Sequence, residues 1–246
     1  MDNTLLINLS HQLAAFRSMD VIASNIANVG TPGYKRESAQ FSEFIETVPP
    51  AEDEDGPQKL SFVQDAGIAR DLSSGALEKT NAPYDLAISG QGYFTVKSAD
   101  GTTHYTRNGH FTLDAEGRIA TENGELLQGD GGEISVTSDD GDIHISQDGT
   151  VTGAKGQLGK VQLVNFDNER ALQKQGDSLY TTTQQAKPVD QPNIEQGSIE
   201  QSNVRPVVEI SNMLEVMRAY QTTASLTESQ ETLMRQAIDK LGQVES

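Results

Sequence analysis

The segment closest to a known chemical motif is GTVTGAKGQLGK, residues 149–160. A phosphate-binding loop requires a glycine, four further residues, Gly-Lys and then Ser or Thr, because backbone amides, the lysine and the hydroxyl together hold phosphate and magnesium. Here Val161 follows Gly159-Lys160, and Ala154 stands in the place of the first glycine. The sequence therefore predicts no nucleotide-binding loop.

Metal and nucleophile chemistry is also incomplete in the sequence. Asp53, Asp55 and Gly56 imitate the middle of a calcium loop, but Ala51 and Phe62 stand at its first and twelfth positions. The chain contains no cysteine, and zinc-ligand spacing is absent from its four histidines, which are His11, His104, His110 and His144. We therefore expect no metal, no cofactor, no small-molecule substrate and no enzymatic activity.

The formal net charge of −18 is concentrated in the middle of the chain. Residues 37–203 hold 11 cations and 28 acids, whereas both ends are nearly neutral. Nucleic acid is not an expected partner, because phosphate contacts need clustered Lys and Arg. The distribution predicts ends that associate and a middle that faces water.

The start of the chain predicts neither a cleaved signal peptide nor a membrane-inserted helix. MDNTLL carries an acid where a signal peptide needs cations. Gln12, Arg17 and Asp20 interrupt the apolar run that follows, so the run is too polar to span a bilayer.

Both ends of the chain have the periodicity of amphipathic helices. Apolar residues recur at intervals of three and four from Leu6 to Ala27 and from Ile210 to Leu241. A seam of this spacing is typical of helices that pair as in a coiled coil. We predict that the two end helices pack on each other; the alternative is that each packs separately on the central domain.

The middle of the chain predicts short strands. Alternating apolar stretches such as GYFTVK (92–97) and DIHIS (142–146) are separated by Asp-Gly and Asn-Gly pairs, which favour hairpin turns. The predicted fold class is mixed α and β, with N- and C-terminal helices pairing as a coiled-coil-like layer and a central antiparallel all-β domain of short strands and hairpins. The expected divisions are an N-terminal helix at 1–30, a junction loop and extended segment at 31–67 with an exposed loop at 49–57, the β domain at 68–185, a linker at 186–203 and a C-terminal helix at 204–246.

The first helix should end in NIANVGTPGYK, residues 25–35. Glycine and proline stop the helix and give the backbone freedom to leave the helical layer. The cations that follow are expected to contact a neighbouring subunit or the acidic β domain. The predicted junction turn comprises Asn25, Asn28, Gly30, Pro32, Gly33, Tyr34 and Lys35.

Four stretches resemble the family of bacterial flagellar basal-body rod and hook proteins. MDVIASNIANVGTPGYKR (19–36) is similar to the N-terminal signature of that family. YDLAISGQGYFTV (84–96), HYTRNGHFTLDAEGRIATENGELL (104–127) and GSIEQSNVRPVVEISNMLEVMRAYQ (197–221) match the family further along, in the same order. Within the family, the start MDNTLLINLSHQLAAFRSMD and the ending AIDKLG most resemble the proximal-rod members.

The resemblance implies a structural, self-assembling subunit of the flagellar basal body that serves motility. Such a subunit is exported by the flagellar type III export apparatus without a cleaved signal peptide. It then assembles axially in the periplasm with copies of itself and with other rod proteins. On this hypothesis, helix pairing and lateral subunit contacts are carried by Leu6, Leu9, Leu13, Phe16, Ile22, Ile26, Ile210, Met213, Met217, Tyr220, Ile238 and Leu241.

Other functions stay open at this point. The chain is alternatively a distal-rod or hook-type axial subunit of the same family, or a non-flagellar soluble binding module dimerised by its terminal helices. A dimer of fixed size at all concentrations would favour the binding module. A cell-wall enzyme is a third hypothesis, and the missing cysteine, nucleophile elbow and metal spacing argue against it.

Overall fold

The computed structural model describes residues 2–48 and 58–244, and the side chains of residues 4–47 and 59–240. The loop expected at 49–57 lies outside the described residues. The chain divides into two compact units. The helical unit consists of residues 1–27, 37–69 and 205–246, and the β unit consists of residues 28–36 and 70–204.

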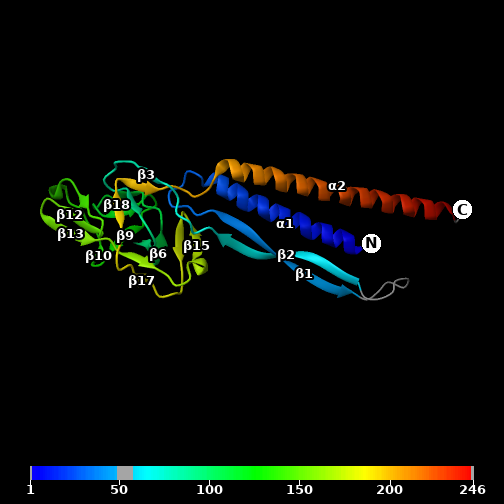
Figure 1. Ribbon diagram of the computed structural model, residues 1–246, viewed down its shortest axis with the longest axis horizontal. Coiled ribbons are helices and arrows are strands. Elements are labelled where there is room, and N and C mark those ends of the chain that lie inside the picture. Colours follow the sequence, from blue (N-terminus) through cyan, green and yellow to red (C-terminus); the bar gives the residue numbers. More distant parts are fainter. Residues whose placement is uncertain (1, 49–57, 245–246) are drawn as a thin grey trace. The chain divides into compact units, whose positions relative to one another are not determined.

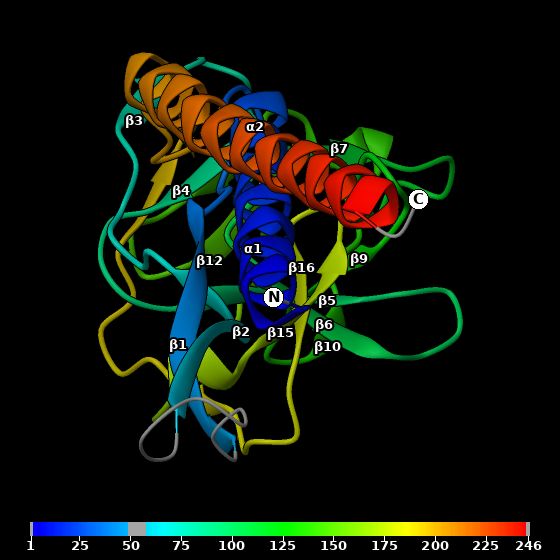
Figure 2. The ribbon, with the colours of Figure 1, turned by 90° about the vertical axis from the view of Figure 1, so that its right-hand side faces the viewer.

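Two antiparallel helices and a hairpin form the helical unit. The helix α1 (Asp2–Ala27) lies between α2 (Pro206–Val244) and the hairpin of β1 (Glu37–Val48) and β2 (Gln58–Arg70), as Figures 1 and 2 show. Proline is tolerated at the start of α2, because the first N–H groups of a helix have no intrahelical partner. The predicted helices at both ends are confirmed, and they lie side by side.

The segment at 31–67, expected to be a junction loop and an extended segment, contains two paired strands. Most of it belongs to the β1–β2 hairpin. The hairpin lies against α1, where the Val63 amide donates to Ser10 Oγ at 3.3 Å and Arg17 Nε lies 3.4 Å from an Asp65 carboxylate oxygen. A two-stranded hairpin is marginal alone, so this support explains strands that a local sequence pattern does not reveal.

The β unit is built from short antiparallel strands around one large sheet. The ten-stranded sheet follows the path β15-β16-β6-β5-β9-β8-β7, with β10 paired to β9 and β14 paired to both β5 and β17. Smaller sheets have the orders β11-β12-β13, β18-β4 and β19-β3. The strands are β3 (Leu77–Lys79), β4 (Leu86–Ile88), β5 (Tyr93–Lys97), β6 (Thr103–Thr106), β7 (Phe111–Leu113), β8 (Ile119–Thr121), β9 (Leu126–Gly129), β10 (Gly132–Glu133), β11 (His144–Ile145), β12 (Thr150–Gly153), β13 (Gly156–Lys160), β14 (Leu163–Asn165), β15 (Gln173–Gly176), β16 (Leu179–Thr181), β17 (Lys187–Pro188), β18 (Ile194–Gln196) and β19 (Ser198–Glu200).

Two of the predicted Asp-Gly turns connect paired antiparallel strands. Gly101 connects β5 to β6 with φ +86°, and Gly149 connects β11 to β12 with φ +87°, a backbone region that favours glycine. The glycine-rich segment that fell short of a phosphate loop is the antiparallel β12–β13 hairpin. Its glycines therefore serve strand pairing and turning.

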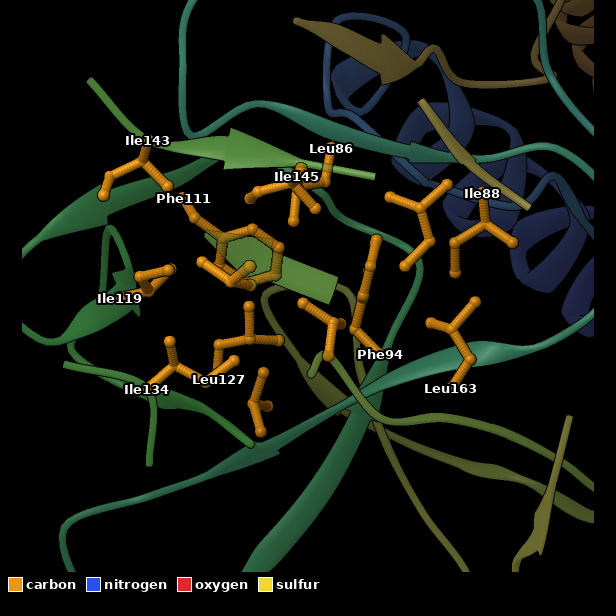
Figure 3. Close-up of a cluster of buried hydrophobic side chains, with 14 of the residues drawn as sticks. Leu86, Ile88, Phe94, Phe111, Ile119, Leu127, Ile134, Ile143, Ile145 and Leu163 are labelled. Atoms are coloured by element: carbon orange, nitrogen blue, oxygen red, sulfur yellow. The ribbon is translucent and has the colours of Figure 1, made fainter. Parts of the chain in front are cut away.

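A large apolar core fills much of the β unit (Figure 3), and a smaller second cluster consists of Tyr93, Val164, Phe166, Leu172 and Tyr180. Phe94 and Phe111 meet edge to face at the centre of the large core, with ring centroids 5.3 Å apart and both side chains buried. Alternate residues of the short strands supply the rest, because successive side chains of a strand point to opposite faces. The labelled members in Figure 3 are Leu86, Ile88, Phe94, Phe111, Ile119, Leu127, Ile134, Ile143, Ile145 and Leu163.

The prediction of a linker at 186–203 is corrected by the structure. It contains β17, β18 and β19, which pair with β14, β4 and β3 respectively. Its buried residues include Ile194 and Glu200. A local sequence pattern does not reveal these strands, because they contain proline and polar residues and because the partners of β18 and β19 lie about a hundred residues earlier in the chain.

Candidate subunit interface

Polar side chains join the two helices of the helical unit. Asn8 Nδ2 donates to Gln230 Oε1, and Gln12 Nε2 donates to Thr227 Oγ1, both at 3.4 Å. These pairs fix the antiparallel register, with the first half of α1 beside the second half of α2. Amide and hydroxyl side chains therefore make this part of the contact.

The predicted interface residues separate into three groups by exposure. Ile22 is buried, and Ile26 and Met213 are half-buried. The side chain of Leu241 lies outside those described. The others are exposed by at least 36%, so a substantial part of each is accessible: Leu6, Leu9, Leu13, Phe16, Ile210, Met217, Tyr220 and Ile238.

These exposures define two apolar surfaces. The α1 stripe consists of Leu6, Leu9, Leu13 and Phe16, which are 47–63% exposed. The α2 stripe consists of Val207, Ile210, Leu214 and Met217, which are 41–77% exposed. Each set repeats at three- and four-residue intervals, so its members line one side of their helix. Val207 and Leu214 are additions that the sequence prediction missed.

An apolar groove opens between the far ends of the two helices. Its volume is about 580 Å³, and it is lined by Thr4 and Leu5 of α1 and by residues 230–238 of α2. Leu233 and Ile238 at its rim are exposed. The helical unit therefore carries apolar surface on several sides.

Asn25 ties together three elements of the helical unit. Its Nδ2 donates to the Glu37 carbonyl at 2.7 Å, its Oδ1 accepts from the Glu37 amide at 2.9 Å, and Nδ2 also reaches Glu209 Oε2 at 3.2 Å. All three residues are buried. The Glu209 carboxylate lies in the first turns of α2, where the helix dipole favours negative charge. Asn25 thus fixes the end of α1 to the starts of β1 and α2.

The rest of the junction turn belongs to the β unit. Asn28 accepts from the Thr31 amide at 3.2 Å, while Gly30 is exposed and has open space around it. The Gly33 amide donates to the Glu200 carbonyl at 2.7 Å. A side chain at Gly33, whose φ is +69°, would overlap the Arg107 backbone. Gly33, rather than Gly30, is therefore the glycine that this turn requires.

A buried ion cluster of Lys35, Arg107 and Glu200 follows this turn. Lys35 Nζ donates to Glu200 Oε1 at 2.6 Å and to the Ser73 carbonyl at 2.9 Å, and Arg107 Nη1 lies 3.3 Å from Glu200 Oε2. The Gly75 amide also donates to Glu200 Oε1 at 2.9 Å. The cluster gathers the three segments of the β unit that lead to the helical unit.

Electrostatics make Glu200 the indispensable member of the ion cluster. Burial lowers the pKa of Lys35 from its usual value, and the nearby Glu200 carboxylate opposes that effect. Both cations share this single carboxylate, and all three side chains are at most 6% exposed. Removing one partner of a buried pair leaves an uncompensated charge. Glu200 therefore holds the cluster together.

The sequence patterns predicted a role in the junction for Lys35 but not for Arg107, Glu200 or Glu209. Charged residues are usually solvated, so their types gave no sign of burial. Arg107 and Glu200 lie within two of the stretches that resemble the family, and that position is the one sequence signal that could have identified them.

Across the residues that the structure describes, no group of three His, Cys, Asp or Glu side chains could hold a metal ion. Over the same part of the chain, every helix is too short or too polar to cross a membrane. Apolar helical faces and buried polar junctions are the features that stand out.

Three family models match successive parts of the chain. Residues 12–35 match the model described as flagella basal body rod protein, and residues 87–153 match the flagellar hook protein FlgE/F/G D1 domain. Residues 195–240 match the flagellar basal body rod FlgEFG protein C-terminal model. The first and third include much of α1 and α2, and the second lies in the β unit.

Full-length relatives agree with these matches. The flagellar basal-body rod protein FlgF of Caulobacter vibrioides is 38% identical over 99% of this chain and 100% of its own length. FlgG of Buchnera aphidicola subsp. Acyrthosiphon pisum is 33% identical over 89% of this chain and 92% of its own. FlgF of Mesorhizobium japonicum is 29% identical over 98% and 99%. The chain belongs to the family of flagellar basal-body rod proteins and is of the FlgF type.

Proposed function

We propose that this chain is a structural subunit of the proximal flagellar rod, which stacks axially with copies of itself and with other rod proteins as part of the drive shaft for motility. Its place is the periplasmic basal body, and the flagellar export apparatus delivers it there. No enzymatic step, nucleic acid, small-molecule substrate or membrane insertion enters this function. Family membership supports the location and the partners.

The exposed apolar stripes carry the proposal. A folded protein that stays alone rarely leaves regularly spaced large apolar side chains uncovered on adjoining helices. Covering each half-exposed leucine or phenylalanine contributes about 1 kcal/mol, so one stripe supplies several kcal/mol per contact. Helix-to-helix contacts between copies therefore supply favourable apolar free energy that offsets the entropic cost of association.

The form of the assembly follows from having two different surfaces. A contact between unlike surfaces repeats from copy to copy, and it produces an open helical polymer unless its rotation closes a ring. A rod needs such a contact along its length. The acidic β unit, which keeps its core covered, is suited to the solvent-facing part of the assembly.

Sedimentation and electron microscopy of the purified chain test the proposal. Wild-type protein should form longer particles as its concentration rises, and the Leu9→Ser/Leu13→Ser variant should stay monomeric. The matched control is Leu113→Ser, which changes a 37% exposed leucine of the β unit. A dimer of fixed size at every concentration would contradict the proposal and favour a binding module.

A further inference from the structure

We infer that neighbouring copies of this chain dock through unlike stripes, with the α1 stripe of one copy lying against the α2 stripe of the next. The inference rests on the proposed function and names the contact that it uses. Both stripes belong to the helical unit, and both are at least 41% exposed in a single copy.

The two stripes match in spacing. Leu6, Leu9, Leu13 and Phe16 follow intervals of three, four and three residues, and the members of the α2 stripe follow the same intervals from Val207. Helices with such spacing pack by inserting the side chains of one helix between those of the other along a shared seam. In an antiparallel arrangement, Leu9 meets Leu214 near the centre of the contact, and the ends of the two stripes coincide.

Charge favours this pairing between copies of an acidic chain. The net charge of −18 makes copies repel each other, so a self-contact must avoid acidic surface. Residues 3–16 contain no Asp, Glu, Lys or Arg. Beside the α2 stripe, Glu209 is buried with Asn25, which leaves Glu215 as the acid exposed there. Both stripes can therefore lose water at little electrostatic cost.

The register of the helix pair prevents the two stripes of one copy from meeting. Asn8 lies beside Gln230 and Gln12 lies beside Thr227. Along the axis of the helix pair, the centre of the α1 stripe is therefore at the same height as residue 228 of α2, whereas the α2 stripe is centred near residue 212. At 1.5 Å per residue this separation is about 24 Å. A contact between copies therefore shifts each copy by about 24 Å along the helix axis, which yields an open stack.

The absence of cysteine from the chain allows an unambiguous cross-linking test. One copy carries Leu9→Cys and a size tag, and the other carries Leu214→Cys; the two are mixed under conditions in which the wild-type chain assembles, then oxidised. Disulfides require Cβ atoms about 4 Å apart, so only facing residues react well. The matched control replaces Leu214→Cys by Leu226→Cys, which is similarly exposed but off the α2 stripe.

The expected result is at least a fivefold higher yield of the Leu9→Cys/Leu214→Cys cross-link than of the Leu226→Cys control or of Leu9→Cys with itself. Assembly with equal yields, or with mostly self-linked Leu9→Cys, would overturn the inference while leaving the proposed function intact. Failure of the wild-type chain to assemble at any concentration would overturn both.

Discussion

The β unit and the helical unit place their apolar residues in opposite ways. The β unit encloses its large side chains, and Phe94, Val96 and Leu127 have no measurable exposure. The helical unit leaves much of its apolar surface bare, and polar pairs such as Asn8–Gln230 join part of its helices. The β unit therefore covers its apolar residues within a single copy, whereas the proposed function has neighbouring copies cover the apolar surface of the helical unit.

The largest expected effect is on the core of the β unit. Phe94→Ala removes a fully buried ring that packs edge to face on Phe111, and it should lower the free energy of unfolding by about 3–5 kcal/mol. Urea denaturation followed by circular dichroism measures the change. A loss of less than 1 kcal/mol would show that the β unit does not depend on this core.

A slightly smaller effect is expected in the ion cluster. Glu200→Gln leaves Lys35 and Arg107 buried without their carboxylate, which should cost about 3 kcal/mol of unfolding free energy. The control is Glu195→Gln at an exposed position of β18, which should change little. Equal effects of the two variants in urea denaturation would refute the role assigned to Glu200.

Tyr93 should make the β unit sensitive to alkaline pH. Its burial, aided by the nearby Glu169 carboxylate, raises the pKa of Tyr93 far above its usual value of 10.0. Above pH 10 the unfolded chain ionises this phenol while the folded chain keeps it protonated, so stability falls as pH rises, by up to about 1.4 kcal/mol per pH unit.

Tyr93→Phe should remove this part of the alkaline loss, and Tyr220→Phe in α2 should retain it. Thermal unfolding between pH 9 and 11.5 measures the difference. Parallel pH profiles for the wild type and both variants would show that Tyr93 has no such effect.

The smallest effect on the single copy is expected in the α1 stripe. Leu13 is 63% exposed, so Leu13→Ser should change the unfolding free energy of the monomer by no more than about 0.5 kcal/mol. The same variant should weaken self-association severely in sedimentation experiments. A large loss of monomer stability with unchanged association would show that the α1 stripe stabilises the single copy and does not serve contacts between copies.

Local patterns in the sequence were sufficient for the terminal helices and the short central strands. The three- and four-residue intervals from Leu6 and from Ile210 reflect helix geometry, and alternation with Asp-Gly turns reflects hairpin geometry. The β1–β2 hairpin and the strands at 187–200 were missed, because β2 depends on support from α1 and Ile194 depends on a partner strand far away in the chain.

In the candidate interface, too, the features set by neighbouring residues in the sequence could be predicted, whereas those set by contacts between distant segments could not. Periodicity identified the apolar residues of α1, but it did not reveal whether they face α2 or solvent. The predicted junction turn includes both Gly30 and Gly33, and in the structure Gly33 lies against the Arg107 backbone while Gly30 has open space around it. Burial of Glu200 between two cations arises from segments that meet only in the folded chain.

Hydrogen exchange on the monomer and on the assembled form tests most directly whether the helical unit depends on neighbours. Amides of β5 and β9 should exchange slowly in both forms, since the core of the β unit is complete in one copy. Amides of the first half of α1 should exchange quickly in the monomer and become protected on assembly. Protection of α1 in the monomer as strong as that of β5, unchanged by assembly, would contradict this account.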